Sequence, residues 1–89
     1  MFTNLQPIAE LDKATGKVYV SNNVSPRDWK EIKTGQQLYY GQLLKVSPGT
    51  NANGEKINKY AWVKCNNKGT PTMIPSSLTE WSIAANCAY

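Results

Sequence analysis

The chain has 89 residues, of which 40% are hydrophobic and 18% charged, and its formal net charge is +4. This length leaves room for a single domain, 1–89, with one modest core, and the composition excludes a disordered chain. No apolar run is long enough to cross a bilayer, and Met1–Pro7 lacks the basic and apolar parts of a signal peptide. We therefore expect a soluble protein, cytoplasmic or associated with a virion, that does not insert into membranes.

The first strand and a helix are predicted within residues 17–33. Lys17–Ser21 alternates apolar and polar side chains, which is typical of a strand. Ser25 followed by Pro26 is a helix-start pattern, because serine caps a helix and proline is tolerated at its first position. Val24 and Trp29 would pack around this cap as a hydrophobic staple. We expect one or two helical turns between Ser25 and Lys33, with Trp29 filling the core.

The middle of the chain predicts a β-hairpin. Gln37–Val46 is the longest strand-like run, and Gly41 within it indicates a bulge or the close approach of another strand. A turn signal at Asn53–Gly54 lies in the polar stretch that follows. The simplest pairing is an antiparallel hairpin of Leu38–Val46 with Ile57–Cys65.

The end of the chain contributes a closing strand. Residues 66–77 include Gly69, Pro71 and Pro75, which exclude a helix there. Trp81–Ile83 is interpreted as a strand, with Trp81 in the core. The predicted fold is mainly β, a small antiparallel sheet or an SH3-like, partly open barrel with one short helix.

Two cysteines, Cys65 and Cys87, allow one disulfide. Closing a loop of this length would contribute about 3 kcal/mol in the chain-entropy model. A buried free thiol is equally ordinary in a small core. Because no secretion signal is visible, we favour free thiols.

Residues 60–65 form the most informative stretch of the chain. Alternate side chains of a strand share a face. One face would carry Tyr60, Trp62 and Lys64, and the other Ala61, Val63 and Cys65. Such a strand packs inward through its small residues and presents flat rings outward, although two large aromatics also suit an ordinary core.

Several kinds of chemistry have no support in the sequence. The chain has no histidine and only two cysteines, which argues against a general base at neutral pH and against a zinc site. Its six carboxylates show no spacing typical of an acid–base pair, and no glycine-rich loop precedes a helix. We therefore expect no catalytic residues, no metal site, no cofactor and no enzymatic activity.

Aromatic side chains are the remaining candidates for function. Flat rings stack on the apolar faces of sugars and on nucleobases, while neighbouring polar groups supply hydrogen bonds. The predicted ligand-binding residues are Tyr60, Trp62, Tyr39, Lys64 and Tyr19. The sequence favours a non-catalytic, carbohydrate-binding module with glycan as its first-choice partner.

Two other binding functions remain open. Between Lys33 and Thr79 there are six lysines and one acid, Glu55, so this part of the chain is basic. Single-stranded nucleic acid is one alternative partner, with phosphate contacts from Lys45, Lys56, Lys59, Lys64 and Lys68. A protein partner is the other, bound through an edge strand in an assembly or inhibitor subunit.

Four short segments carry a resemblance: Gly35–Gly41, Tyr60–Lys64, Asn67–Pro71 and Glu80–Ile83. In this order they resemble the small chitin-binding modules of carbohydrate-binding families 5 and 12, which also occur appended to phage tail proteins. The stretch Ser47–Asn58 is an insertion relative to that pattern. The resemblance implies that Tyr60 and Trp62 stack on sugar rings, that Trp81 is structural, and that the protein is phage-like.

Overall fold

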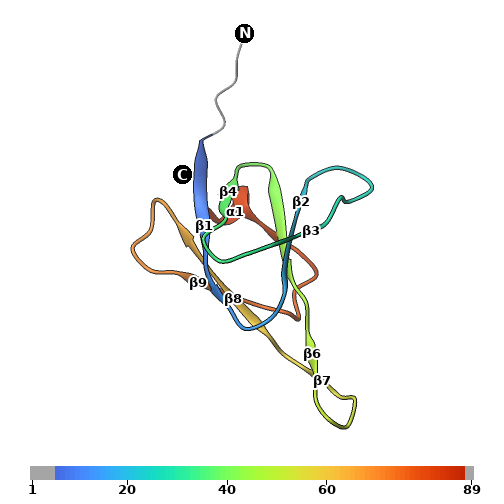
Figure 1. Cartoon of the computed structure of the whole chain (residues 1–89). Helices are drawn as coiled ribbons and strands as arrows, with labels where there is room; N and C mark the ends of the chain where they lie inside the picture. The colour runs from blue at the N-terminus through green and yellow to red at the C-terminus, as the bar shows by residue number, and fades with distance from the viewer. Residues whose placement is uncertain (1–5, 88–89) are drawn as a thin grey trace.

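The structure is a computed structural model that describes residues 6–87. Strands dominate it, and one short helix ends it (Figure 1). The elements are β1 (Pro7–Ala14), β2 (Val18–Asn22), β3 (Lys30–Ile32), β4 (Gln37–Tyr39), β5 (Gln42–Val46), β6 (Gly49–Thr50), β7 (Lys56–Ile57), β8 (Tyr60–Cys65), β9 (Thr72–Pro75), β10 (Trp81–Ser82) and α1 (Ile83–Cys87). The predicted fold class, mainly β with small antiparallel sheets and one short helix, is confirmed.

Two four-stranded antiparallel sheets make up the body of the molecule. Sheet A has the strand order β4-β1-β8-β9, and sheet B has the order β10-β5-β2-β3. The remaining two strands form the β6–β7 hairpin, which projects away from the body at the lower end of Figure 1. Each sheet has an inner face that packs on the core and an outer face that points away from it.

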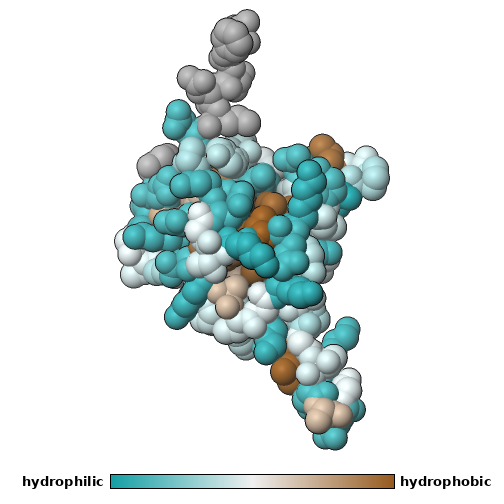
Figure 2. All heavy atoms as spheres, in the orientation of Figure 1, coloured by the Kyte–Doolittle hydropathy of each residue, from teal (hydrophilic) through white to brown (hydrophobic). Residues whose placement is uncertain are grey.

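The core is shared by the inner faces of both sheets and by α1. Sheet A contributes Ala61 and Val63, both fully buried, and sheet B contributes Leu44 and Val46. Ile83 of α1 completes the same cluster. Most of the surface in Figure 2 is hydrophilic, with a hydrophobic area near the centre and smaller ones at the upper right and at the lower end. Burial of apolar side chains between the sheets is the main stabilising contribution.

The predicted helix over Ser25–Lys33 is wrong. The chain is irregular there and then forms β3, which pairs with β2. Asp28 does not serve a helix cap, because its carboxylate accepts hydrogen bonds from the Ser21 hydroxyl (2.7 Å) and the Asn22 backbone N–H (3.0 Å). Val24 is 49% exposed, so the predicted staple is absent. The hydrogen bonds of Asp28 to β2 and the pairing of β3 with β2 replace the local capping pattern.

The predicted hairpin of Leu38–Val46 with Ile57–Cys65 is also wrong. Tyr40 and Gly41 form a turn in which Gly41 has a φ of 91°, a conformation that favours glycine. This turn sends β4 to sheet A and β5 to sheet B. No atom lies within 4 Å of the position that a Gly41 Cβ would take, so the glycine serves the turn rather than a close approach.

The expectation of free thiols is wrong, because Cys65 of β8 and Cys87 of α1 form a disulfide across a sequence separation of 22 residues. The bond ties the C-terminal helix to the centre of sheet A. Trp81 is 8% exposed and belongs to the core as predicted. The predicted closing strand is shorter than expected, because Ile83 already begins α1.

The Thr15–Gly16 turn packs closely on the start of β8. A Cβ at Gly16 would lie 2.6 Å from the Lys59 Cβ and 2.9 Å from the Ser47 carbonyl oxygen, so a larger residue does not fit. Between residues 6 and 87, no helix is both long enough and apolar enough to span a membrane.

Candidate functional site

The structure divides the predicted ligand-binding residues between the two sheets. Tyr60, Trp62 and Lys64 lie on the outer face of sheet A, as their alternation with buried neighbours predicts. Tyr39 belongs to the same sheet but is separated from β8 by β1. Tyr19 lies in sheet B, so it cannot join the other four in one binding surface.

The β8 surface consists of Tyr60, Trp62, Lys64 and their cross-strand neighbours Lys13 and Met73. The rings of Tyr60 and Trp62 have centroids 6.2 Å apart and are tilted by 47°. The Lys13 ammonium lies 4.6 Å from the centroid of the Trp62 ring, and Met73 is 53% exposed. The two rings therefore do not form one plane, and an ammonium already contacts the indole.

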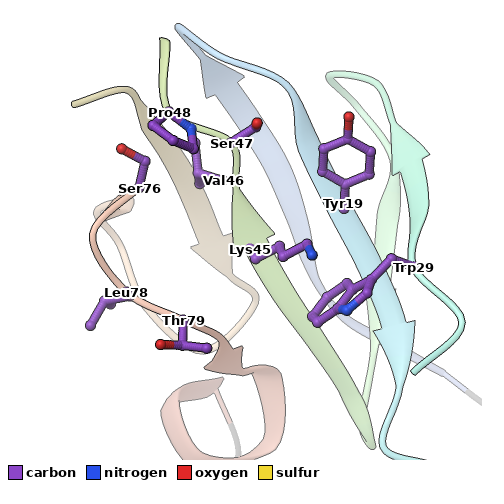
Figure 3. A pocket seen from close by; sticks show the side chains of 9 residues that line it. All are labelled: Tyr19, Trp29, Lys45, Val46, Ser47, Pro48, Ser76, Leu78 and Thr79. Atoms are coloured by element: carbon purple, nitrogen blue, oxygen red, sulfur yellow. The ribbon is translucent and has the colours of Figure 1, made fainter. Parts of the chain in front are cut away.

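A second aromatic site lies on the outer face of sheet B. It is a pocket of about 450 Å³. We call it the Trp29 pocket, and its lining residues are Tyr19, Trp29, Lys45, Val46, Ser47, Pro48, Ser76, Leu78 and Thr79. In Figure 3, the two aromatic side chains lie on one side of it and the segment 76–79 on the other.

Lys45 extends across this pocket between its two aromatic rings. The Lys45 Nζ lies 4.4 Å from the centroid of the Trp29 ring and 5.9 Å from that of the Tyr19 ring. Tyr19 and Lys45 are direct cross-strand partners in β2 and β5, which accounts for their proximity. Figure 3 shows the lysine chain running from β5 toward the indole. The arrangement is a cation–π cluster at the base of a concave surface.

The segment before β3 holds Trp29 in position. Asp28 is hydrogen-bonded to Ser21 in both directions, since its carboxylate accepts from the hydroxyl and its backbone N–H donates to the same oxygen at 2.9 Å. Arg27 forms an ion pair with Glu80, with 3.1 Å between Nη2 and Oε1. The loop is therefore anchored to β2 on one side and to the segment before β10 on the other.

The hydrogen bonds to Asp28 also change its acidity. The Ser21 hydroxyl, followed by the backbone N–H of Asn22, lowers the pKa of the Asp28 carboxyl below its ordinary value. Hydrogen bonds to the charged form of a carboxyl favour that form. Asp28 thus holds the loop as a carboxylate, and protonation would weaken this anchor.

Hydroxyl groups supply most of the polar atoms of the Trp29 pocket. Ser76 Oγ accepts a hydrogen bond from the Lys59 backbone N–H (3.0 Å), which leaves its own proton free to donate. Ser47 and Thr79 add two more hydroxyls, and no acidic side chain lines the pocket. The described residues contain no group of three or more His, Cys, Asp or Glu that could hold a metal. This arrangement is suited to binding a ring with polar substituents.

Sequence reasoning missed Trp29, which we expected in the core. It is half-buried and lines the pocket instead. A signal was present: in a strand, Trp29 and Glu31 alternate with Lys30 and Ile32, and Ile32 is the buried residue. A strand interpretation of this segment would have placed the indole outside.

No known protein family, curated protein or solved structure matches the chain. The function is therefore argued from the geometry of the two outer faces.

Proposed function

We propose that this protein is a non-catalytic glycan-binding module that takes up a sugar ring in the Trp29 pocket. The observation that carries the proposal is the pairing of two aromatic rings with a hydroxyl-lined, concave surface of about 450 Å³. This volume lies within the range of about 300–1,000 Å³ that is typical of small-molecule sites. Such a module would serve as an attachment or accessory component, for example in a virion.

The chemistry of the pocket walls matches the two kinds of surface that a sugar ring has. The apolar C–H face of a pyranose can pack on the indole of Trp29 or the ring of Tyr19. Its hydroxyls can exchange hydrogen bonds with Ser76 and Thr79 from the opposite wall and with Ser47 at the end of β5. One wall of the pocket therefore offers apolar packing to the sugar ring, and the other offers hydrogen bonds to its hydroxyls.

The β8 surface is a weaker candidate for the same role. The resemblance to chitin-binding modules assigns sugar stacking to Tyr60 and Trp62, and this assignment stays a prediction. The tilt of 47° between these rings keeps them from forming one flat surface, and the side chains around them come from neighbouring strands of an open sheet, without a second wall. We propose that this surface is secondary to the Trp29 pocket.

A nucleic-acid-binding function is less well supported by the positions of the aromatic residues. A single strand bound without sequence preference needs stacking rings and cations that follow one continuous path. Tyr19 and Lys45 lie on sheet B, whereas Tyr60, Trp62 and Lys64 lie on the outer face of sheet A. A short ligand such as an oligosaccharide can bind to Tyr19 and Lys45 alone, so the separation of the two sets of residues favours a glycan.

The proposal is tested by titrating a panel of neutral and acidic oligosaccharides, chitin oligosaccharides included, with oligothymidylate as a further probe in calorimetry. We expect at least one oligosaccharide to bind and Trp29→Ala to weaken it about fivefold or more, because a base stacked on an aromatic side chain contributes about 1–3 kcal/mol and we expect a similar contribution for a stacked sugar ring. Trp62→Ala is the matched control. Trp29→Leu provides a second variant if the alanine variant does not fold. Binding of oligothymidylate alone, or sugar binding that survives both Trp29 substitutions, would overturn the proposal.

A further inference from the structure

The Trp29 pocket contains one charged side chain, and that charge has no counter-ion. Lys45 is the only lysine among its lining residues, which include no arginine, aspartate or glutamate. Within residues 6–87, the ion pairs are Arg27 with Glu80 and Lys33 with Glu31, and Lys45 takes part in neither. An ammonium has three donors, and among the described residues those of Lys45 have no hydrogen-bond acceptor. They are available to a ligand.

The acids on this side of the molecule are already engaged. Glu80 lies 3.1 Å from Arg27, and Glu31 of β3 lies 3.4 Å from the Lys33 ammonium. Asp28 accepts hydrogen bonds from Ser21 and Asn22. None of these three carboxylates forms an ion pair with Lys45.

We infer that the sugar bound in the Trp29 pocket is acidic and that its carboxylate binds the Lys45 ammonium. This inference rests on the proposed glycan-binding function and narrows its ligand class. A sugar stacked on Trp29 or Tyr19 meets the ammonium directly, since Nζ lies 4.4 Å and 5.9 Å from the two ring centroids. A ligand carboxylate would gain a charge-assisted hydrogen bond there.

The single charge of the pocket favours a carboxylate over a phosphate. Phosphate groups are usually bound by several cations, by bidentate arginine or by backbone N–H groups at a helix start. The Trp29 pocket is lined by one lysine and otherwise by neutral side chains. A monoanionic uronic or sialic acid is therefore the better match in charge.

The test compares ligands that differ at their carboxyl groups. Trigalacturonate and its fully methyl-esterified form are titrated into the protein, and sialyllactose is compared with its methyl ester. In at least one of these pairs we expect the acidic member to bind about tenfold tighter than its neutral counterpart, because a charged hydrogen bond contributes about 1.5–3 kcal/mol. The affinity of the acidic member should also fall with added salt, whereas that of the neutral member should not.

Variants of the lysine locate the effect. Lys45→Met should reduce the affinity for the acidic sugar to that for the neutral one, Lys45→Arg should retain the preference, and Lys64→Met on the β8 surface should leave it unchanged. If neutral sugars, including chitin oligosaccharides, bind as tightly as acidic ones, the inference is wrong and the proposed function stands. If no sugar binds, both are wrong. The wild-type comparison decides the inference even if Lys45→Met does not fold.

Discussion

The outer faces of the two sheets use the same pair of side chains in different surroundings. On sheet A the Lys13 ammonium lies 4.6 Å from the ring of Trp62, and on sheet B the Lys45 ammonium lies 4.4 Å from the ring of Trp29. Only the second pair lines a pocket of about 450 Å³. An aromatic residue with a lysine beside it is therefore not enough to make a binding site.

The difference comes from the connections rather than from the strands. The Trp29 pocket has a second wall because the segment 76–79 faces the two rings, and Arg27 ties the loop before β3 to Glu80. The β8 surface is built from neighbouring strands alone, so its side chains spread over an open sheet. Loop anchoring turns one of two similar outer faces into a concave site.

Loss of the disulfide should lower stability more than any other change considered, and it should affect the outer faces of both sheets equally. The Cys65–Cys87 bond closes a loop with a sequence separation of 22, for which the chain-entropy model gives about 3 kcal/mol. Cys87→Ser should therefore lower the free energy of unfolding by about this amount in urea titration. Both sheets should unfold together in a single transition. A variant that unfolds in two steps would contradict the shared core.

Removal of an indole should separate the two faces. Trp29→Ala should reduce sugar affinity about fivefold or more, and Trp62→Ala should change it less than about threefold. Calorimetry gives both affinities, and circular dichroism checks that each variant is folded. Equal losses for the two variants would mean that both faces bind sugar, and a larger loss for Trp62→Ala would reverse our ranking.

Releasing the loop before β3 should lower the sugar affinity of the Trp29 pocket without removing any group that touches the sugar. Glu80→Gln breaks the ion pair with Arg27, which is partly exposed and so contributes about 0–1 kcal/mol to stability. We expect sugar affinity to fall about threefold while the melting temperature changes little. Glu10→Gln on sheet A is the matched control, and an equal effect from it would show that the loss is unspecific.

Acidification should have the smallest of these effects, a loss of stability caused by protonation of Asp28. The folded state lowers the pKa of this carboxyl, so its contribution to stability is fully present above the unfolded value of about 4 and is lost as the pH falls through the lower folded value. Thermal unfolding between neutral pH and pH 2 measures this loss. Asp28→Asn removes this titration, so the variant should lose less stability on acidification than the wild type. If both proteins lose the same amount, Asp28 is not an anchor of the loop.

The parts of the fold that depend on local alternation could be predicted from the sequence. Val18 is buried while Tyr19 lies on the other face of β2, and Trp62 alternates with two fully buried neighbours. These patterns report the two faces of a strand directly, whichever strand is the partner. The predicted outward position of Trp62 and Tyr19 followed from this alone.

Features that depend on distant partners could not be predicted in this way. Ser25 and Pro26 fit a helix start, but the ion pair of Arg27 with Glu80, at a sequence separation of 53, belongs to a tertiary arrangement that no local pattern reveals. Likewise, nothing in the spacing of Cys65 and Cys87 shows that α1 returns to β8. The Trp29 pocket joins residues from position 19 to position 79, so its existence depends on the whole topology.

The β6–β7 hairpin offers an attachment site for a label in these experiments. Its tip is organised by its own contacts, since the Asn51 side-chain oxygen accepts hydrogen bonds from the backbone N–H groups of Asn53 (2.9 Å) and Glu55 (3.0 Å). Ala52 is exposed in the loop between β6 and β7, and this hairpin projects from the body of the molecule in Figure 1. A fluorophore or biotin attached through Ala52→Cys would orient the immobilised protein with its candidate sites directed to the solution.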